Sequence, residues 1–154
     1  MENRILTDPE YHGIIRDKLG LDDSVLPDTI IERMNGVELA EKVIIKRLTE
    51  AKLTYSTILA GEDALYLKMA TIFCVCALLA SDFGQGALRS EKLPDYQYEN
   101  FQVDMGKKEK DFWGKADEFL CKISGYDLSS KKIVDVIKGH TETEKKTSGT
   151  SSPY

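Results

Sequence analysis

The chain has 154 residues, of which 42% are hydrophobic and 31% charged, values that fit one globular domain with a core large enough to need no disulfide or metal. The net charge is -5, and no clustered basic excess accompanies it, which argues against a protein that holds nucleic acid by its phosphates. The cysteines are odd in number, which argues against a closed disulfide framework; they are Cys74, Cys76 and Cys121.

Helix start and stop signals divide roughly the first third of the chain into three expected helices. Asp8 and Pro9 indicate the start of the first helix, because an Asp side chain caps the free backbone N–H groups of a first turn and Pro has no N–H to leave unpaired there. Gly20 indicates the end of this helix. The second helix is expected from about Pro27 and the third over about 37–51, with a break at Asn35-Gly36 between them. The expected apolar face of the first helix consists of Ile14, Ile15 and Leu19.

The most hydrophobic segment predicts a central helix over about 63–82. Its apolar run over 69–80 is interrupted only by Thr71. This run is shorter than the roughly 20 apolar residues that cross a bilayer, so it indicates a buried core helix. The expected buried face consists of Leu65, Met69, Ile72, Phe73, Cys76, Leu79 and Ala80.

The pattern changes after Gly84 and Gly86, and a β-hairpin is predicted at about 87–105. Aromatic and apolar residues alternate there with polar ones. They occupy even-numbered positions before Glu99-Asn100 and odd-numbered positions after it. Alternation is typical of a half-buried strand, and a slip of phase suggests a β-bulge. The alternating residues are Tyr96 and Tyr98, then Phe101, Val103 and Met105.

A last helix is expected over about 107–124, ended by Gly125, and an apolar island follows it. The island is β-branched, which favours a strand, and it consists of Ile133, Val134, Val136 and Ile137. A short apolar segment near a chain end either docks on its own domain or pairs with a neighbouring subunit, and the sequence favours neither. The predicted organisation is therefore a mainly α domain at 1–125, a bundle of about five helices with the hairpin, and an extended C-terminal arm and flexible tail at 126–154.

The residues that could carry chemistry each have a simpler structural role. Cys74 and Cys76 are two apart on a helix and point in different directions, so they do not share a metal ion and are expected to be core thiols. His12 and His140 have no evident catalytic partner. Acidic pairs stand at expected helix starts, where acids cap helices; they are Asp22-Asp23 and Glu62-Asp63. We therefore expect no enzyme activity, no cofactor and no metal site.

The order of elements resembles the head–tail connector proteins of long-tailed bacteriophages, also called adaptor or head-completion proteins. The resemblance covers roughly 9–123: a short helix, the acidic turn at Asp22-Asp23, helix pairs leading to the apolar helix, the tyrosine-bearing hairpin, and a final helix with Phe112-Trp113. It is a resemblance of pattern, because this family has no catalytic motif to compare.

The resemblance implies a structural protein of the virion, made in the host cytoplasm and placed at the head–tail interface. Such proteins form a ring, commonly a dodecamer, between the portal protein and the next neck or tail protein, and extend a channel through which DNA passes without sequence-specific binding or membrane contact. The arm (Ile133, Val134, Val136, Ile137) would then contact a neighbouring subunit or the portal, and the hairpin (Tyr96, Tyr98, Phe101, Val103) a partner or the channel. Two other readings stay open: a cytoplasmic helical adaptor or regulatory module, and a small helical hydrolase whose acids bind a metal.

Overall fold

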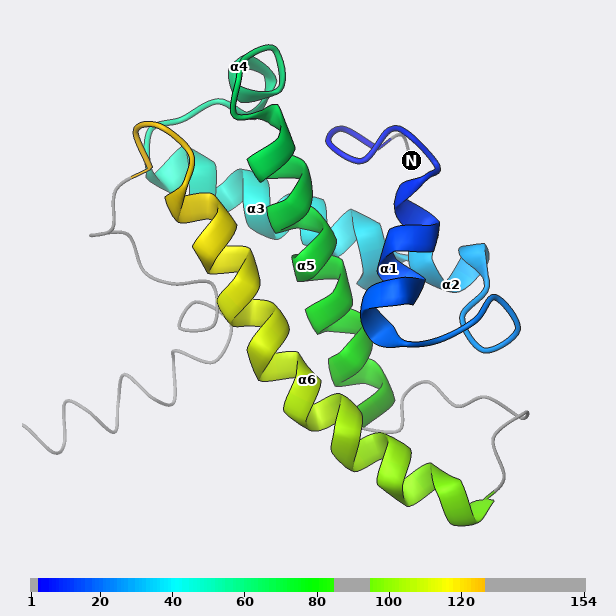
Figure 1. The fold of residues 1–154 in the computed structure, drawn as a ribbon. Coiled ribbons are helices and arrows are strands. Elements are labelled where there is room, and N and C mark those ends of the chain that lie inside the picture. Colours follow the sequence, from blue (N-terminus) through cyan, green and yellow to red (C-terminus); the bar gives the residue numbers. More distant parts are fainter. Residues whose placement is uncertain (1–2, 85–94, 127–154) are drawn as a thin grey trace, which may run out of the picture.

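The computed structural model describes residues 3–84 and 95–126, and within these ranges every regular element is a helix (Figure 1). The protein is therefore mainly helical, as predicted. The elements are α1 (Tyr11–Leu19), α2 (Asp28–Glu32), a π-helical turn (Met34–Glu38), α3 (Leu39–Glu50), α4 (Tyr55–Leu59), α5 (Ala64–Gly84) and α6 (Asp95–Cys121).

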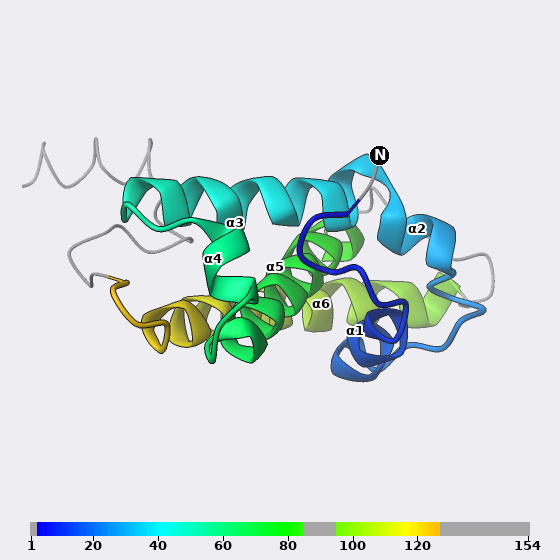
Figure 2. The same cartoon turned by 90° about the horizontal axis from the view of Figure 1, so that it is seen from above.

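Helix α5 lies at the centre of the bundle. It pairs with α6 along most of its length, and α3 crosses both helices on one face while α1 covers another side (Figures 1 and 2). By length and composition alone α5 would pass for a membrane span, but 61% of its most apolar stretch is buried inside the bundle. The predicted core helix is therefore confirmed in its place and its extent.

Aromatic rings fill the seam between α5 and α6. Phe73 of α5 stacks on Phe119 with ring centroids 5.7 Å apart and also meets Phe112 at 6.2 Å. Nearer the end of α5, Phe83 meets Phe101 edge to face at 5.2 Å. Such offset and edge-on contacts stabilise aromatic pairs beyond the area that they bury, so this seam fixes how the two long helices lie against each other.

Gly20 ends α1 as predicted, and Gly36 interrupts the chain between α2 and α3 where a break was predicted. Gly20 has φ = 71°, and the N–H groups of Gly20 and Leu21 donate to the carbonyls of Asp17 and Arg16 at the end of α1. Gly36 departs from helical geometry between α2 and α3, and a Cβ built there would lie 2.1 Å from the carbonyl oxygen of Ile31. Only glycine permits this close approach of two backbone segments.

The hairpin predicted at 87–105 is wrong in its second half, because residues 95–105 form the first turns of α6. Residues 87–94 lie outside the described residues. The helix places Phe101 against Phe83 and buries Met105 to 2% exposure, so two apolar residues four apart meet α5 from one helix face. The predicted arm lies beyond the described residues; it includes Ile133, Val134, Val136 and Ile137.

The contact at Gly36 makes a prediction about stability. We expect Gly36→Ala to lower the free energy of unfolding by about 1–3 kcal/mol, because the new methyl group must displace the backbone of Ile31. Gly114→Ala in α6 is the matched control: nothing lies within 4 Å of a Cβ there. Alanine in an open helix position should instead raise the free energy by about 0.5–1 kcal/mol. Urea unfolding followed by circular dichroism measures both, and equal effects of the two substitutions would contradict the close approach.

Candidate interaction site

Three large hydrophobic side chains stand out as exposed among the described residues: Leu65 at 65%, Val103 at 57% and Ile14 at 37%. Leu65 and Ile14 were predicted on buried helix faces, and for these two residues the prediction is wrong. They lie close together, since both line one groove, whereas Val103 lies on α6 near the opposite end of α5. The described surface therefore has two separate apolar regions.

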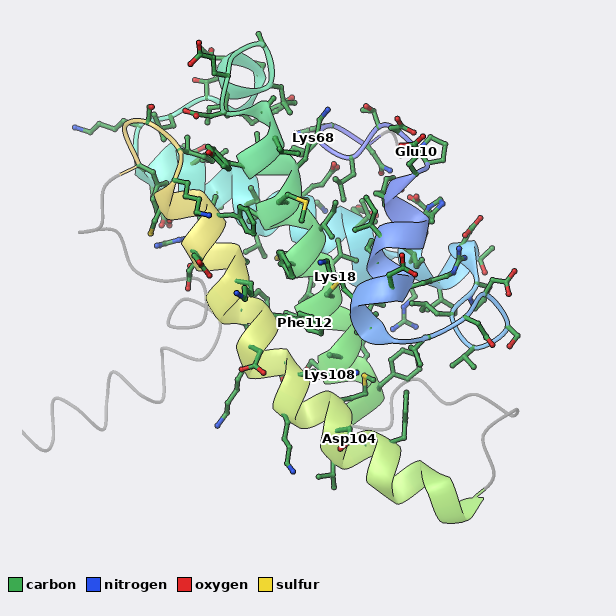
Figure 3. All side chains as sticks on the ribbon, in the orientation of Figure 1. Glu10, Lys18, Lys68, Asp104, Lys108 and Phe112 are labelled. Carbon is green, nitrogen blue, oxygen red and sulfur yellow. The ribbon has the colours of Figure 1, made fainter. Side chains whose placement is uncertain are left out.

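The first region is a groove of about 210 Å³ between the N-terminal segment, α1 and the first turns of α5. We call it the α1–α5 groove. Exposed charged residues also line it, and Figure 3 shows Lys68 on α5 and Glu10 at the start of α1 on its two sides. Most clefts that bind another molecule combine such an apolar lining with a few polar groups. The apolar lining consists of Ile5, Leu6, Tyr11, Ile14, Leu65, Met69 and Ile72.

One wall of this groove is held by the buried carboxylate of Glu41 on α3. Its Oε1 accepts a hydrogen bond from the backbone N–H of Arg4 at 2.9 Å, and its Oε2 accepts those of Ile5 and Leu6 at 2.6 and 2.8 Å. Glu41 is only 5% exposed, so its charge is compensated by these donors. Because Ile5 and Leu6 line the groove, Glu41 positions that wall.

The second region is the start of α6, which projects beyond the end of α5. Gly84, the last residue of α5, lies beside Gln102 and Gly106, so the turns of α6 before Gln102 extend past the end of α5 (Figure 1). This projecting part contains Tyr96, Tyr98 and Phe101, and Val103 lies next to it. The structure thus brings all four of these predicted interface residues onto one helical segment, although Phe101 packs inward on Phe83.

His12 belongs to a polar network between α1 and α2, and 16% of its side chain is exposed. Its Nε2 lies 2.7 Å from Glu32 Oε1, and its Nδ1 lies 3.6 Å from Asp28 Oδ1. Arg16 donates hydrogen bonds to Asp28 and to the carbonyl of Leu26, and the bond to Asp28 holds the pKa of that carboxyl below its usual range. Both ring nitrogens of His12 face carboxylates, so this arrangement joins two helices.

The thiols of Cys74 and Cys76 are buried, as predicted for core residues, and burial raises the pKa of both well above the usual range. Cys121 is exposed. In the part of the chain that the structure describes, no three His, Cys, Asp or Glu side chains are grouped so as to hold a metal ion.

Sequence reasoning missed a buried polar cluster where α3 meets the end of α6. Arg47 is 1% exposed and donates to Glu50 at 3.1 Å, and Asp117 of α6 is 8% exposed. Burial raises the pKa of the nearby Tyr126 hydroxyl, while the Arg47 guanidinium opposes the rise. The only signal in the sequence was position, because Arg47 is three residues after Ile44 on the apolar stripe of α3. This cluster joins elements within the core.

The chain matches no family model, no curated protein and no solved structure. The two apolar surfaces and the contacts that position them are therefore the features that bear on its function.

The role of Glu41 can be tested by Glu41→Gln. The amide would direct an NH2 group at one of the backbone N–H donors, and one buried hydrogen bond left unmade costs about 1–3 kcal/mol. We expect that loss in the free energy of unfolding, together with faster hydrogen exchange at the amides of Ile5 and Leu6. Glu38→Gln, which removes only a surface pair with Lys42, should cost no more than about 0.5 kcal/mol. Unchanged protection of Ile5 and Leu6 in Glu41→Gln would contradict the role of Glu41.

The burial of two thiols predicts their reactivity. One thiol per folded chain should react with iodoacetamide at neutral pH, because Cys121 is exposed while Cys74 and Cys76 are buried and protonated. All three should react in urea, and Cys121→Ser should abolish the reaction of the folded protein. Mass spectrometry counts the modified sites, and modification of Cys74 or Cys76 in the folded chain would show that α5 is not covered as described.

Proposed function

We propose that this protein is a structural subunit that acts through contacts with other protein chains, as a head–tail connector in the neck of a phage particle. The observation that carries the proposal is the pair of apolar surfaces at opposite ends of α5. Leu65 lies in its first turn and Val103 beside its last, and a helix of 21 residues is about 30 Å long. Burial of exposed apolar area, such as that of Leu65 and Val103, against a partner is favourable because it removes this area from water.

The separation of these surfaces suits a ring. A two-fold dimer uses one patch twice, whereas a ring needs two different surfaces on each subunit, one for each neighbour. Leu65 in a groove and Val103 on a projecting helix are two such different surfaces. Each contact is small, but simultaneous contacts around a closed ring multiply one another's effect.

The charge of the chain fits passage of DNA through such a ring. With a net charge of -5 and no basic excess, the protein has little electrostatic attraction for phosphate, so DNA would slide through the channel. Under this proposal the neighbours are further copies of the chain in a ring of twelve, the portal protein and the next neck or tail protein. The site of action is the head–tail interface of the virion after synthesis in the host cytoplasm. The role is geometric and includes no catalysis.

The α1–α5 groove also favours a second candidate, a monomeric or dimeric adaptor that receives an apolar helix of a partner. An amphipathic helix lays its apolar face into such a groove. The two candidates differ in assembly, because the adaptor needs the groove alone and the connector also needs the projecting start of α6.

Assembly of the purified full chain, alone and with a portal protein if one is encoded near its gene, tests the connector proposal. We expect light scattering and negative-stain images to show a ring in at least one of these conditions, and Val103→Asp to abolish it while leaving the melting temperature nearly unchanged, because Val103 is exposed. Gly114→Asp adds the same charge at an open position about three turns further along α6 and should leave the ring intact. A chain that forms no ring in either condition, or a gene with no portal or tail gene near it, would overturn the proposal.

A further inference from the structure

We propose that the α1–α5 groove is occupied by a segment of the same chain, residues 131–138 (KKIVDVIK), which lies beyond the described residues. The sequence left open whether this apolar island docks on its own domain or on a neighbour. The size of the groove, its distance from the end of α6 and the charges that line it all favour docking of the segment within its own chain.

The groove has room for this segment and lacks a cover among the described residues. Its volume is about 210 Å³, and an apolar cavity of about 150 Å³ is enough to hold a benzene ring, so branched side chains fit. Leu65 and Ile14 on its two sides are 65% and 37% exposed. Ile133, Val134, Val136 and Ile137 give the segment four branched apolar side chains within five positions.

The groove is within reach of the segment in a single molecule. The backbone N–H of Ser124 donates to Asp63 Oδ2 at 2.9 Å, so the chain leaves α6 beside the start of α5, two residues before Leu65. The seven residues from Tyr126 to Ile133 span up to about 23 Å when extended. This span covers the groove, because Ile72, the lining residue of α5 farthest from Asp63, is about 14 Å along the helix from it. A tethered segment has an effective concentration in the millimolar range, so in dilute solution it outcompetes the same segment of a second copy.

The charges of the groove and the segment are complementary. Asp8 and Glu10 line the groove on the side of α1, and Lys68 lines it on the side of α5. The segment carries Lys131 and Lys132 before its apolar residues, Lys138 after them, and Asp135 between them. Exposed ion pairs contribute little each, so the charges orient the segment while the apolar contacts hold it.

This docking is a property of one chain and does not require the connector function. It holds for a monomer in dilute solution, and a neighbour that binds the groove during assembly would have to displace the segment. The test is therefore made at concentrations where light scattering gives a monomer.

Alkylation of a cysteine placed in the groove tests the proposal. The full chain carries Cys121→Ser with either Leu65→Cys or Val103→Cys, and iodoacetamide is the probe. Leu65 and Val103 are 65% and 57% exposed in the described structure, so without an occupant the two thiols should react at similar rates. With the segment docked, we expect the thiol at position 65 to react about tenfold more slowly, the factor that corresponds to about 1.4 kcal/mol. Adding Ile133→Asp and Ile137→Asp should restore the rate at position 65 and leave the rate at 103 unchanged. Equal rates at 65 with and without these two substitutions would overturn the proposal.

A disulfide distinguishes the segment's own groove from that of a neighbour. Full chains with Cys121→Ser, Val134→Cys and either Leu65→Cys or Val103→Cys are oxidised at low concentration. We expect a crosslink within one chain for the pair 65–134 and none for 103–134. A disulfide-linked dimer through positions 65 and 134, or no crosslink at all, would overturn docking within the chain. Ring formation is scored separately through Val103→Asp, so either proposal can fail alone.

Discussion

The need to cover α5 shapes the rest of the structure. Its middle is apolar around the whole circumference, and each fully buried Leu, Ile or Phe side chain contributes about 1.5–3 kcal/mol relative to an exposed one. One neighbour cannot cover a helix on all sides, so α6, α3 and α1 each take a part of its surface. Even its one polar side chain in this region, Thr71, bonds back to the carbonyl of Leu67 at 2.8 Å. Among the described residues, the first turns of α5 are only partly covered: Leu65 is exposed there, and the α1–α5 groove lies beside it.

Apolar contact is non-directional, so polar links set how the covering elements lie. Glu41 holds the N-terminal segment through three backbone N–H groups. Figure 3 shows Lys108 on α6 and Lys18 on α1. Lys108 donates to the carbonyl of Leu19 at 3.2 Å, and a cation at this C-terminal end stabilises α1. Lys18 lies over the ring of Phe73, 5.4 Å from its centroid. These links tie α1 to both long helices, and with Glu41 they fix the two sides of the groove.

Local signals predicted α1, α5 and the breaks at Gly20 and Gly36, because composition and glycine conformation act within a few residues. The start of α6 could not be predicted in this way. Phe101, Val103 and Met105 alternate like a strand, but Phe101 and Met105 are also four apart, as on one face of a helix. The surface of α5 that they meet decides between the two, and a sequence read locally does not contain that surface. The exposure of Leu65 was missed for the same reason, since its apolar character indicates burial while its neighbours set the outcome.

The α5–α6 pair also fixes the distance between the two apolar surfaces. The rings of Phe73 and Phe119 are stacked at 13° between planes, and Phe83 and Phe101 meet near the far end. A close-packed seam of this kind resists sliding, because displacement by a fraction of a ring separates several contacts together. The seam therefore makes the two helices a spacer of constant length, with a groove near one end and a projecting helix at the other. The proposed connector function needs this constancy, since neighbours at the two ends of a subunit can be held in register only if the distance between them does not change.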